Sequence, residues 1–266
     1  MSQLLANIHP NAKIGQNVVI EPFATVGDNV EIGDGTWIGP NAVIMSGARI
    51  GKNCKIFPGA VIAGVPMDLK FMGEESLAII GDNTTVREFV TINRGTKATG
   101  VTSVGENCFI MCCVHIAHDC RIGNNVILVG YAGAAGFVNI DDWAIVSGHT
   151  AIHQFVNIGA HSYIAGGSLV RKDVPPFVKA AREPLAFVGI NSVGLRRRGY
   201  SNDQIKNVQD VYKIVFQSGY SLTHALKHLE TEVPESPEKD LVLSFIKNSK
   251  RGLMKGYTPG QDDEDL

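Results

Sequence analysis

The sequence has few of the features that mark membrane-spanning or nucleic-acid-binding proteins. Among its 266 residues, 24 Lys and Arg face 26 Asp and Glu, so it has no excess of basic residues to neutralise a phosphate backbone. No apolar run approaches the roughly 18 residues that cross a bilayer, and the first residues lack the charged and apolar regions of a signal peptide. We therefore expect a cytoplasmic protein with no membrane span and no nucleic-acid partner.

Cysteine and aromatic residues are also scarce, whereas glycine is abundant. The five cysteines, an odd number that includes the adjacent Cys112 and Cys113, indicate reduced thiols rather than a disulfide framework. Aromatic residues make up 7% of the chain, so any core is mainly aliphatic. Glycine accounts for 29 of the 266 residues, which is about 11% against a usual 7%. Glycine at a fixed period indicates turns, and we expect most of it to mark the turns of a repeat.

An aliphatic residue recurs at every sixth position. Neither a helix nor a single strand has this period, but a short strand followed by a turn does. Three such hexads make a triangular coil of 18 residues whose inward aliphatic side chains stack on the coils above and below. This is a parallel β-helix, in which each buried Ile stabilises the fold by roughly 1.5 to 3 kcal/mol. The first ten hexads are marked by Ile8, Ile14, Ile20, Val26, Ile32, Ile38, Ile44, Ile50, Ile56 and Ile62, and the phase continues from Ile80 to Val170.

The repeat divides the chain into three parts. The fold class we predict is mainly β: a β-helix over residues 1–182, an α-helical domain over 183–254 and a disordered acidic tail over 255–266. Two excursions, near 65–78 and 93–103, interrupt the hexads and are candidates for functional loops. The small residue four positions after each aliphatic, which includes Cys54, Cys108 and Cys120, is predicted to point inward.

Helix signals begin where the repeat stops. Ser201 and Gln204 form a capping box ahead of an apolar stripe. A second helix is expected over 222–229, and a third is expected to start at Ser236 and Pro237.

One coil concentrates polar chemistry. His118 lies off the inward positions, and the following Asp119 can orient an imidazole that acts as a general base. Adding 18 residues twice leads to Gly136 and Gln154, so these two residues and His118 are predicted to form one column on successive coils. Such a column places a histidine, a glycine N–H and an amide side chain along one groove, with His153 beside it.

Two other interpretations of this coil remain open. The histidines are surface residues with no role, or they bind zinc together with nearby thiols. The zinc interpretation has weak support, because Cys120 points inward by phase and the spacing matches no common zinc pattern. The candidate ligands are Cys112, Cys113, His115, His118 and Cys120.

A run of three arginines, Arg196, Arg197 and Arg198, precedes the helical part. This run suits bidentate hydrogen bonding to a diphosphate. A solvent-exposed segment ahead of a helix, or a cluster of salt bridges between domains, explains it equally well.

Five segments in this order resemble those of the left-handed β-helix acyltransferases, in particular the UDP-N-acetylglucosamine O-acyltransferase family, which begins lipid A biosynthesis. The resemblance extends from about Ile8 to Gly252. The segments are MDLK (67–70), HIAHDC (115–120), IHQF (152–155), DVPP (173–176) and GLRRRGYS (194–201).

The resemblance implies an activity and an assembly. Members of the family are homotrimers with active sites between subunits. They transfer an (R)-3-hydroxyacyl chain from acyl carrier protein to the 3-hydroxyl of UDP-N-acetylglucosamine. No metal or other cofactor takes part.

The resemblance also assigns roles to residues. It makes His118 the general base, Asp119 its supporting carboxylate and Gly136 the donor to the oxyanion. Gly166 matches the floor of the acyl groove, and its missing side chain suggests a groove open to a long chain. Residues matching substrate contacts are Asp68, Lys70, His115, His153 and Gln154 for the sugar and thioester, and Asn191 and Arg197 for the nucleotide.

Two residues depart from the family pattern. Phe137 stands where the family often has a histidine, and Val193 stands where it has a carboxylate near the nucleotide. Because carrier proteins are acidic, a basic surface formed by Arg171, Lys172, Lys179 and Arg182 is a candidate docking site.

Proteins with other functions are also built on a β-helix of this kind, and these functions are the alternatives to O-acyl transfer. A γ-type carbonic anhydrase requires bound zinc, and the N-acyltransferase of the same pathway carries an additional N-terminal domain, which the hexads starting at Ile8 lead us not to expect. A non-catalytic β-helix would need neither the polar column nor the arginines.

Overall fold

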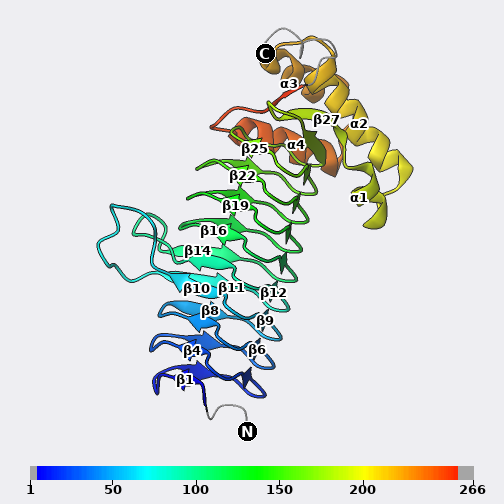
Figure 1. Cartoon of the computed structure of the whole chain (residues 1–266). Coiled ribbons are helices and arrows are strands. Elements are labelled where there is room, and N and C mark those ends of the chain that lie inside the picture. The colour runs from blue at the N-terminus through cyan, green and yellow to red at the C-terminus, as the bar shows by residue number, and fades with distance from the viewer. Residues whose placement is uncertain (1–4, 257–266) are drawn as a thin grey trace.

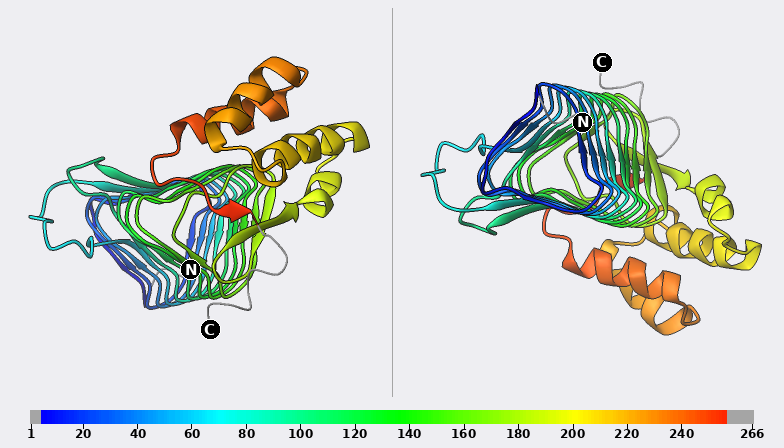
Figure 2. Two further views of the ribbon diagram at one scale, coloured as in Figure 1. Left: turned by 90° about the horizontal axis from the view of Figure 1, so that it is seen from above. Right: turned by 90° about the horizontal axis from the view of Figure 1, so that it is seen from below.

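The computed structural model describes residues 5–256 and shows a left-handed parallel β-helix followed by a helical region (Figure 1). The strands form three parallel sheets, here called A, B and C, and successive strands along the chain visit them in that order. Figure 2 shows the triangular cross-section that results. The predicted tail lies outside the described residues except for Lys255 and Gly256, which pair with sheet C and so are not disordered.

Most strands are only two residues long, because each face of the triangle is one hexad wide. Sheet A consists of β1 (Asn7–Ile8), β4 (Thr25–Val26), β7 (Val43–Ile44), β10 (Val61–Gly64), β13 (Thr91–Asn93), β16 (His115–Ile116), β19 (Gly133–Ala134), β22 (Ala151–Ile152) and β25 (Leu169–Val170). Sheet B consists of β2 (Lys13–Ile14), β5 (Glu31–Ile32), β8 (Ala48–Ile50), β11 (Leu77–Ile80), β14 (Val101–Val104), β17 (Arg121–Ile122), β20 (Asn139–Ile140) and β23 (Asn157–Ile158).

Sheet C continues beyond the repeats. Its parallel prism strands are joined by β27, which runs antiparallel to β26, and by β28. The chain thus stays in this sheet as far as Ile190, beyond the boundary predicted at residue 182. The strands are β3 (Val19–Ile20), β6 (Trp37–Ile38), β9 (Lys55–Ile56), β12 (Thr85–Val86), β15 (Phe109–Ile110), β18 (Ile127–Leu128), β21 (Ile145–Val146), β24 (Tyr163–Ile164), β26 (Val178–Ala181), β27 (Ala186–Ile190) and β28 (Lys255–Gly256).

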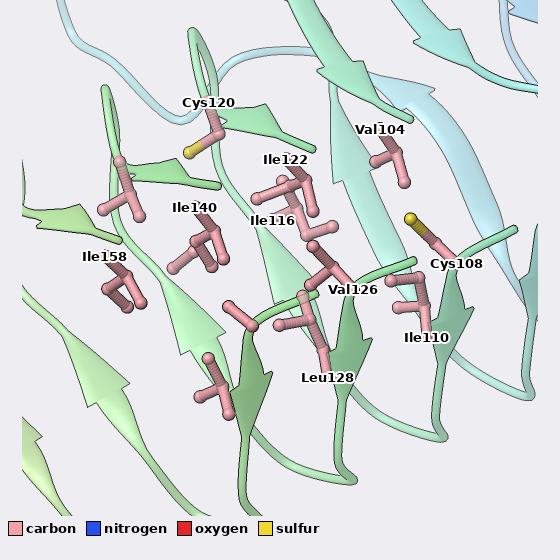
Figure 3. Close-up of a cluster of buried hydrophobic side chains, with 14 of the residues drawn as sticks. Val104, Cys108, Ile110, Ile116, Cys120, Ile122, Val126, Leu128, Ile140 and Ile158 are labelled. Carbon is pink, nitrogen blue, oxygen red and sulfur yellow. The ribbon is translucent and has the colours of Figure 1, made fainter. Parts of the chain in front are cut away.

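The predicted inward positions form the core. The hexad aliphatics from Ile20 to Val170 are buried, and Figure 3 shows their side chains stacked from coil to coil. Cys108 and Cys120 point into the same core, as the phase predicted. Burial raises the pKa of the Cys120 thiol to about 12, so this thiol stays protonated and acts as a small apolar side chain.

The reason for the glycines differs from our expectation. The glycine after each aliphatic does not adopt the left-handed conformation, which falls two residues later on residues such as Asn53, Asp119 and Phe137. A Cβ on Gly33 would instead lie 2.6 Å from the carbonyl carbon of Gly51. These glycines let neighbouring coils approach closely, and most of the left-handed turn positions belong to other residues.

Both predicted excursions leave the prism between sheet A and sheet B, an edge that we call the A–B corner. The longer one joins β10 to β11 and the shorter one joins β13 to β14. They project together from one edge of the triangle (Figure 2). Asn93 Nδ2 donates to the carbonyl of Val65 at 3.0 Å, and the Lys97 amide donates to Glu74 Oε1 at 2.9 Å, so the loops support each other.

Within residues 5–256, four helices follow the prism. The predicted capping box of Ser201 and Gln204 is present, and Ser236 caps a helix with proline in its first turn, as expected. Tyr212 is fully buried, and its hydroxyl donates to the carbonyl of Pro176 at 2.5 Å, which ties the helices to the prism. In the described part of the chain, no helix is long and apolar enough to cross a membrane. The helices are α1 (Ser192–Arg197), α2 (Asn202–Gln217), α3 (Leu222–Glu232) and α4 (Pro237–Asn248).

Candidate active site

The predicted column is present at the A–B corner. The parallel register aligns β16, β19 and β22, the strands that precede His118, Gly136 and Gln154. The amide of Phe137 donates to the His118 carbonyl at 3.1 Å, and the amide of Phe155 donates to the Gly136 carbonyl at 3.2 Å. The three residues therefore occupy equivalent places on consecutive coils, as the 18-residue period requires.

His118 and Asp119 form a buried pair. His118 Nδ1 lies 2.8 Å from Asp119 Oδ2, and the side chains are 8% and 0% exposed. Because an ionised carboxylate only accepts hydrogen bonds, Nδ1 carries the proton and Nε2 keeps its lone pair. Asp119 thus selects the tautomer in which Nε2 acts as the base.

Asp119 is held by the shorter excursion loop. The backbone amide and the hydroxyl of Thr96 donate to its two carboxylate oxygens at 3.0 and 2.8 Å, and the Thr99 hydroxyl donates as well. The hydroxyl of Thr102 accepts the Asp119 amide at 2.8 Å. Burial raises the pKa of Asp119, but the hydrogen bonds from Thr99, His118 and Thr96 outweigh it, and the pKa lies below its usual range.

These threonines were not predicted from the sequence, although the loop that carries them was a candidate for a functional loop. The available signal was the interruption of the hexads close to the coil that carries His118.

The His118 ring leaves no space for a side chain at Gly136. A Cβ at this position would lie 2.7 Å from His118 Cε1 and 2.8 Å from Nε2. Any side chain would therefore displace the imidazole. Among the hydrogen bonds of residues 5–256, none uses the Gly136 N–H, which leaves this donor available beside Nε2.

A groove borders Asp119 on one side. It has a volume of about 510 Å³ and is lined by Asp119, Phe137, Phe155 and Arg251, among others. The Phe137 ring meets the edge of the His118 ring at a centroid distance of 5.5 Å and stacks on Phe155 at 4.8 Å. Phe137 therefore supplies apolar packing at a position where a histidine would supply a hydrogen bond.

The other two histidines of the prediction lie near the pair. His115 is on the outer face of sheet A and shares a hydrogen bond of 2.7 Å with Thr91 Oγ1. Burial, and to a lesser degree nearby His118, lowers the pKa of His115, which keeps this ring neutral. His153 is exposed one coil above Gly136, and its Nδ1 lies 3.1 Å from the carbonyl of Gln154.

Asp68 and Lys70 belong to the same corner but not to the same cluster. They lie on the longer excursion loop, where the Lys70 amide donates to Asp68 Oδ1 at 2.9 Å. The contacts of the described residues do not join either side chain to His118. The loop instead exposes apolar side chains, among them Met67, Leu69 and Met72 at 71%, 104% and 84%.

The remaining predicted residues lie at the other two edges of the prism. Gly166 follows β24 of sheet C and precedes β25 of sheet A, so it lies at the C–A corner. A Cβ there would lie 3.2 Å from the carbonyl oxygen of Gly148. Asn191 caps α1 and donates to the carbonyl of His161, a residue of the corner between sheets B and C. Arg197 lies in α1 and is exposed.

The structure offers no ligand set for the zinc interpretation. Within residues 5–256, no three His, Cys, Asp or Glu side chains lie close enough to hold a metal ion. Cys120 points into the core of the prism (Figure 3).

Known proteins match both parts of the chain. A family model described as UDP-N-acetylglucosamine O-acyltransferase, domain 2, matches residues 173–254, and a bacterial transferase hexapeptide model matches residues 5–35, 29–64 and 102–136. An acyl-[acyl-carrier-protein]–UDP-N-acetylglucosamine O-acyltransferase from Janthinobacterium sp. (strain Marseille) is 44% identical over 201 residues, which are 74% of this chain and 77% of the relative.

Solved structures agree with these matches. A UDP-N-acetylglucosamine acyltransferase from Bacteroides fragilis is 50% identical, with a TM-score of 0.94 over 96% of this chain and all of the other. The enzyme of that name from Francisella novicida is 39% identical, with a TM-score of 0.94 over 98% of this chain and 95% of the other. The family models match both the hexapeptide prism and the helical domain, and the sequence identities to the relatives are 39% to 50%. The chain is therefore an acyltransferase that belongs to the UDP-N-acetylglucosamine O-acyltransferase family.

Proposed function

We propose that this chain transfers an (R)-3-hydroxyacyl group from acyl carrier protein to the 3-hydroxyl of UDP-N-acetylglucosamine, the first step of lipid A biosynthesis. The observation that carries the proposal is the buried pair of His118 and Asp119 beside the free N–H of Gly136. A base next to an oxyanion donor is what acyl transfer to a hydroxyl needs. The names of the relatives supply the two substrates. We propose that the reaction takes place in the cytoplasm.

The transfer proceeds by direct attack. His118 Nε2 removes the proton from the sugar 3-hydroxyl as its oxygen forms a bond to the thioester carbonyl carbon. The Gly136 N–H stabilises the oxyanion, and the Asp119 carboxylate stabilises the imidazolium. The intermediate then collapses, the bond from carbon to sulfur breaks, and the carrier thiolate takes the proton from His118. No covalent acyl-enzyme forms, and a histidine base contributes roughly 10²- to 10⁴-fold to the rate.

We infer that the complete site forms between chains of a homotrimer. Within one chain His118, Gly166 and Arg197 belong to three different edges of the triangle, with the core between them. The acyl chain at Gly166 and the nucleotide at Arg197 reach His118 together only if edges of different subunits meet. The exposed apolar side chains of the longer loop support this arrangement, because a neighbouring subunit would cover them.

The carrier protein would dock near the top of the prism. Arg171 pairs with Glu183 at 3.0 Å, and Lys172 Nζ donates to the carbonyl of Arg251 at 2.9 Å. The second of these bonds brings Lys172 beside Arg251, which lines the groove that reaches Asp119. We propose that Arg171, Lys172, Lys179 and Arg182 together attract an acidic partner.

The test is the reaction itself. Purified protein is incubated with UDP-N-acetylglucosamine and hydroxyacyl carrier protein, and the 3-O-acyl product is measured; the 3-amino analogue of the sugar is assayed in parallel. His118→Ala is expected to lose about 10²-fold or more of the turnover while keeping its oligomeric state. Substantial activity in this variant would refute the assignment of the base, and transfer only to the amino sugar would refute the assignment of the acceptor.

A further inference from the structure

The short helix α1 carries two exposed arginines but has little packing of its own. It is six residues long, and Leu195 is its one buried side chain. Arg196 and Arg197 both point to solvent in its last turn. A helix this short is not stable by itself, so the contacts at its two ends determine where the arginines lie.

A single residue of the prism makes contacts at both ends. At the N-terminal end, Asn191 Nδ2 donates to the carbonyl of His161 at 2.9 Å. At the C-terminal end, Arg198 Nη1 lies 3.2 Å from His161 Nδ1, and Tyr200 Oη lies 3.3 Å from His161 Nε2. His161 is thus joined by three hydrogen bonds to the segment 191–200.

The hydrogen bonds also define the state of the ring. A guanidinium only donates, so Nδ1 of His161 accepts from Arg198 and Nε2 carries the proton that points to Tyr200. Burial, and next the charge of Arg198, lower the pKa of His161 to about 4. The ring is therefore neutral near pH 7, as the bond from Arg198 requires.

Aromatic packing holds the ring in place. His161 stacks between Trp143 and Phe177, with centroid distances of 6.3 and 5.5 Å and interplanar angles of 4° and 12°. Arg198 lies over Trp143 at 5.2 Å, and Tyr200 meets the His161 ring edge-on. Trp143, His161 and Phe177 belong to one column of left-handed turn residues on successive coils of the prism.

We propose that His161 is a positioning residue for sugar-nucleotide binding: by fixing both ends of α1, it orients Arg197 toward the diphosphate. This role rests on the proposed function, in which Asn191 and Arg197 contact the nucleotide. Arg198 connects this segment to the prism, because its guanidinium donates to His161 and lies over the Trp143 ring.

The test compares His161→Phe, which keeps a stacking ring without its hydrogen bonds, with His161→Gln, which keeps an acceptor and a donor. His161→Phe is expected to raise the Kd for UDP and the KM for the sugar nucleotide about tenfold, because two hydrogen bonds to the segment are lost. The KM for the acyl carrier and kcat are expected to stay within about twofold. The Kd of His161→Gln for UDP is expected to lie between that of wild type and that of His161→Phe.

Tyr200→Phe provides a second variant if His161→Phe does not fold, and it is expected to raise the Kd for UDP about threefold. Unchanged UDP affinity in the folded variants would overturn the proposal. An equal loss for both substrates would also overturn it, since that result indicates a purely structural role. Direct UDP binding separates this proposal from the proposed function: wild-type protein that transfers no acyl group contradicts the function, whereas a variant that binds UDP like wild type contradicts the positioning role.

Discussion

At the scale of single residues, the chemistry depends on how one carboxylate is held. Asp119 adopts a left-handed turn conformation, which brings its side chain back against His118. Its buried carboxylate accepts bonds from His118, Thr96 and Thr99. Each bond favours the charged carboxylate, and the charged carboxylate in turn favours the proton on His118 Nδ1. Thr99 therefore acts on the base through Asp119.

We expect Thr99→Val to lower kcat about tenfold with little change in either KM, because a hydrogen bond to a charged group is lost while substrate contacts remain. Steady-state kinetics with both substrates measure this, and Thr99→Ser is expected to retain the activity. Thr84→Val is a control for the loss of a threonine hydroxyl: Thr84 donates to the carbonyl of Gly105 but, unlike the exposed Thr99, is buried in the prism outside the site. A Thr99→Val enzyme with wild-type kcat would contradict the role.

Gly166 is the second residue for which we propose a role in the reaction. We propose that its missing side chain leaves room for the acyl chain at the C–A corner, where the nearest atom to a Cβ would be the Gly148 oxygen at 3.2 Å. Wild-type enzyme is expected to prefer long hydroxyacyl chains, and Gly166→Met to shift the preference to shorter ones. Turnover is compared across carriers with chains of about ten to sixteen carbons, since each buried methylene contributes about 0.8 kcal/mol. A wild-type preference for the shortest chain would contradict the open groove.

At the scale of elements, the corner between sheets B and C links the prism to the helices. His161 is half-buried there, facing Arg198 and Tyr200, with the carboxylate of Asp142 as the nearby negative charge. Its pKa is about 4 in the folded protein, against an unfolded value near 6.5. Between these two values the unfolded chain binds a proton that the folded chain does not, so folding stability falls as the pH is lowered from 6.5 to 4.

Removing the titrating group should remove its share of this acid sensitivity. The melting temperature of His161→Phe is expected to decline less than that of wild type between pH 6.5 and pH 4, even if it is lower at pH 7. Thermal unfolding across that interval measures the difference. Parallel curves for the two proteins would show that His161 does not become protonated on unfolding in this range.

At the scale of the whole molecule, the triangular section separates parts that the chemistry must bring together. His118 and Arg197 lie at different edges of one chain, so a site that uses both joins two chains. Mixed oligomers test this arrangement. His118→Ala and Arg197→Glu chains, each inactive alone, are unfolded together, refolded as a mixture and assayed.

If each site takes one edge from each of two neighbouring chains, about one quarter of the sites in an equal mixture combine two intact edges. The mixture is then expected to recover about a quarter of the wild-type activity. A mixture without activity would show that both residues serve a site within one chain. Each variant refolded separately is the control.

Much of this fold follows from the sequence alone. The six-residue period determines the prism, its inward side chains, the burial of Cys108 and Cys120, and the column of His118, Gly136 and Gln154, because an 18-residue coil repeats without change of register. The capping residues Ser201 and Ser236 determine where two helices begin, since a local hydrogen bond decides it.

Only the tertiary structure decided what the loops and edges do. The threonines that hold Asp119 come from an excursion outside the repeat, whose path no periodicity describes. The close contact between coils explains the glycines, and it depends on backbone distances rather than on residue type. The structure alone also placed the predicted substrate residues at three edges and joined His161 to both ends of α1, because these contacts link residues 30 to 39 positions apart.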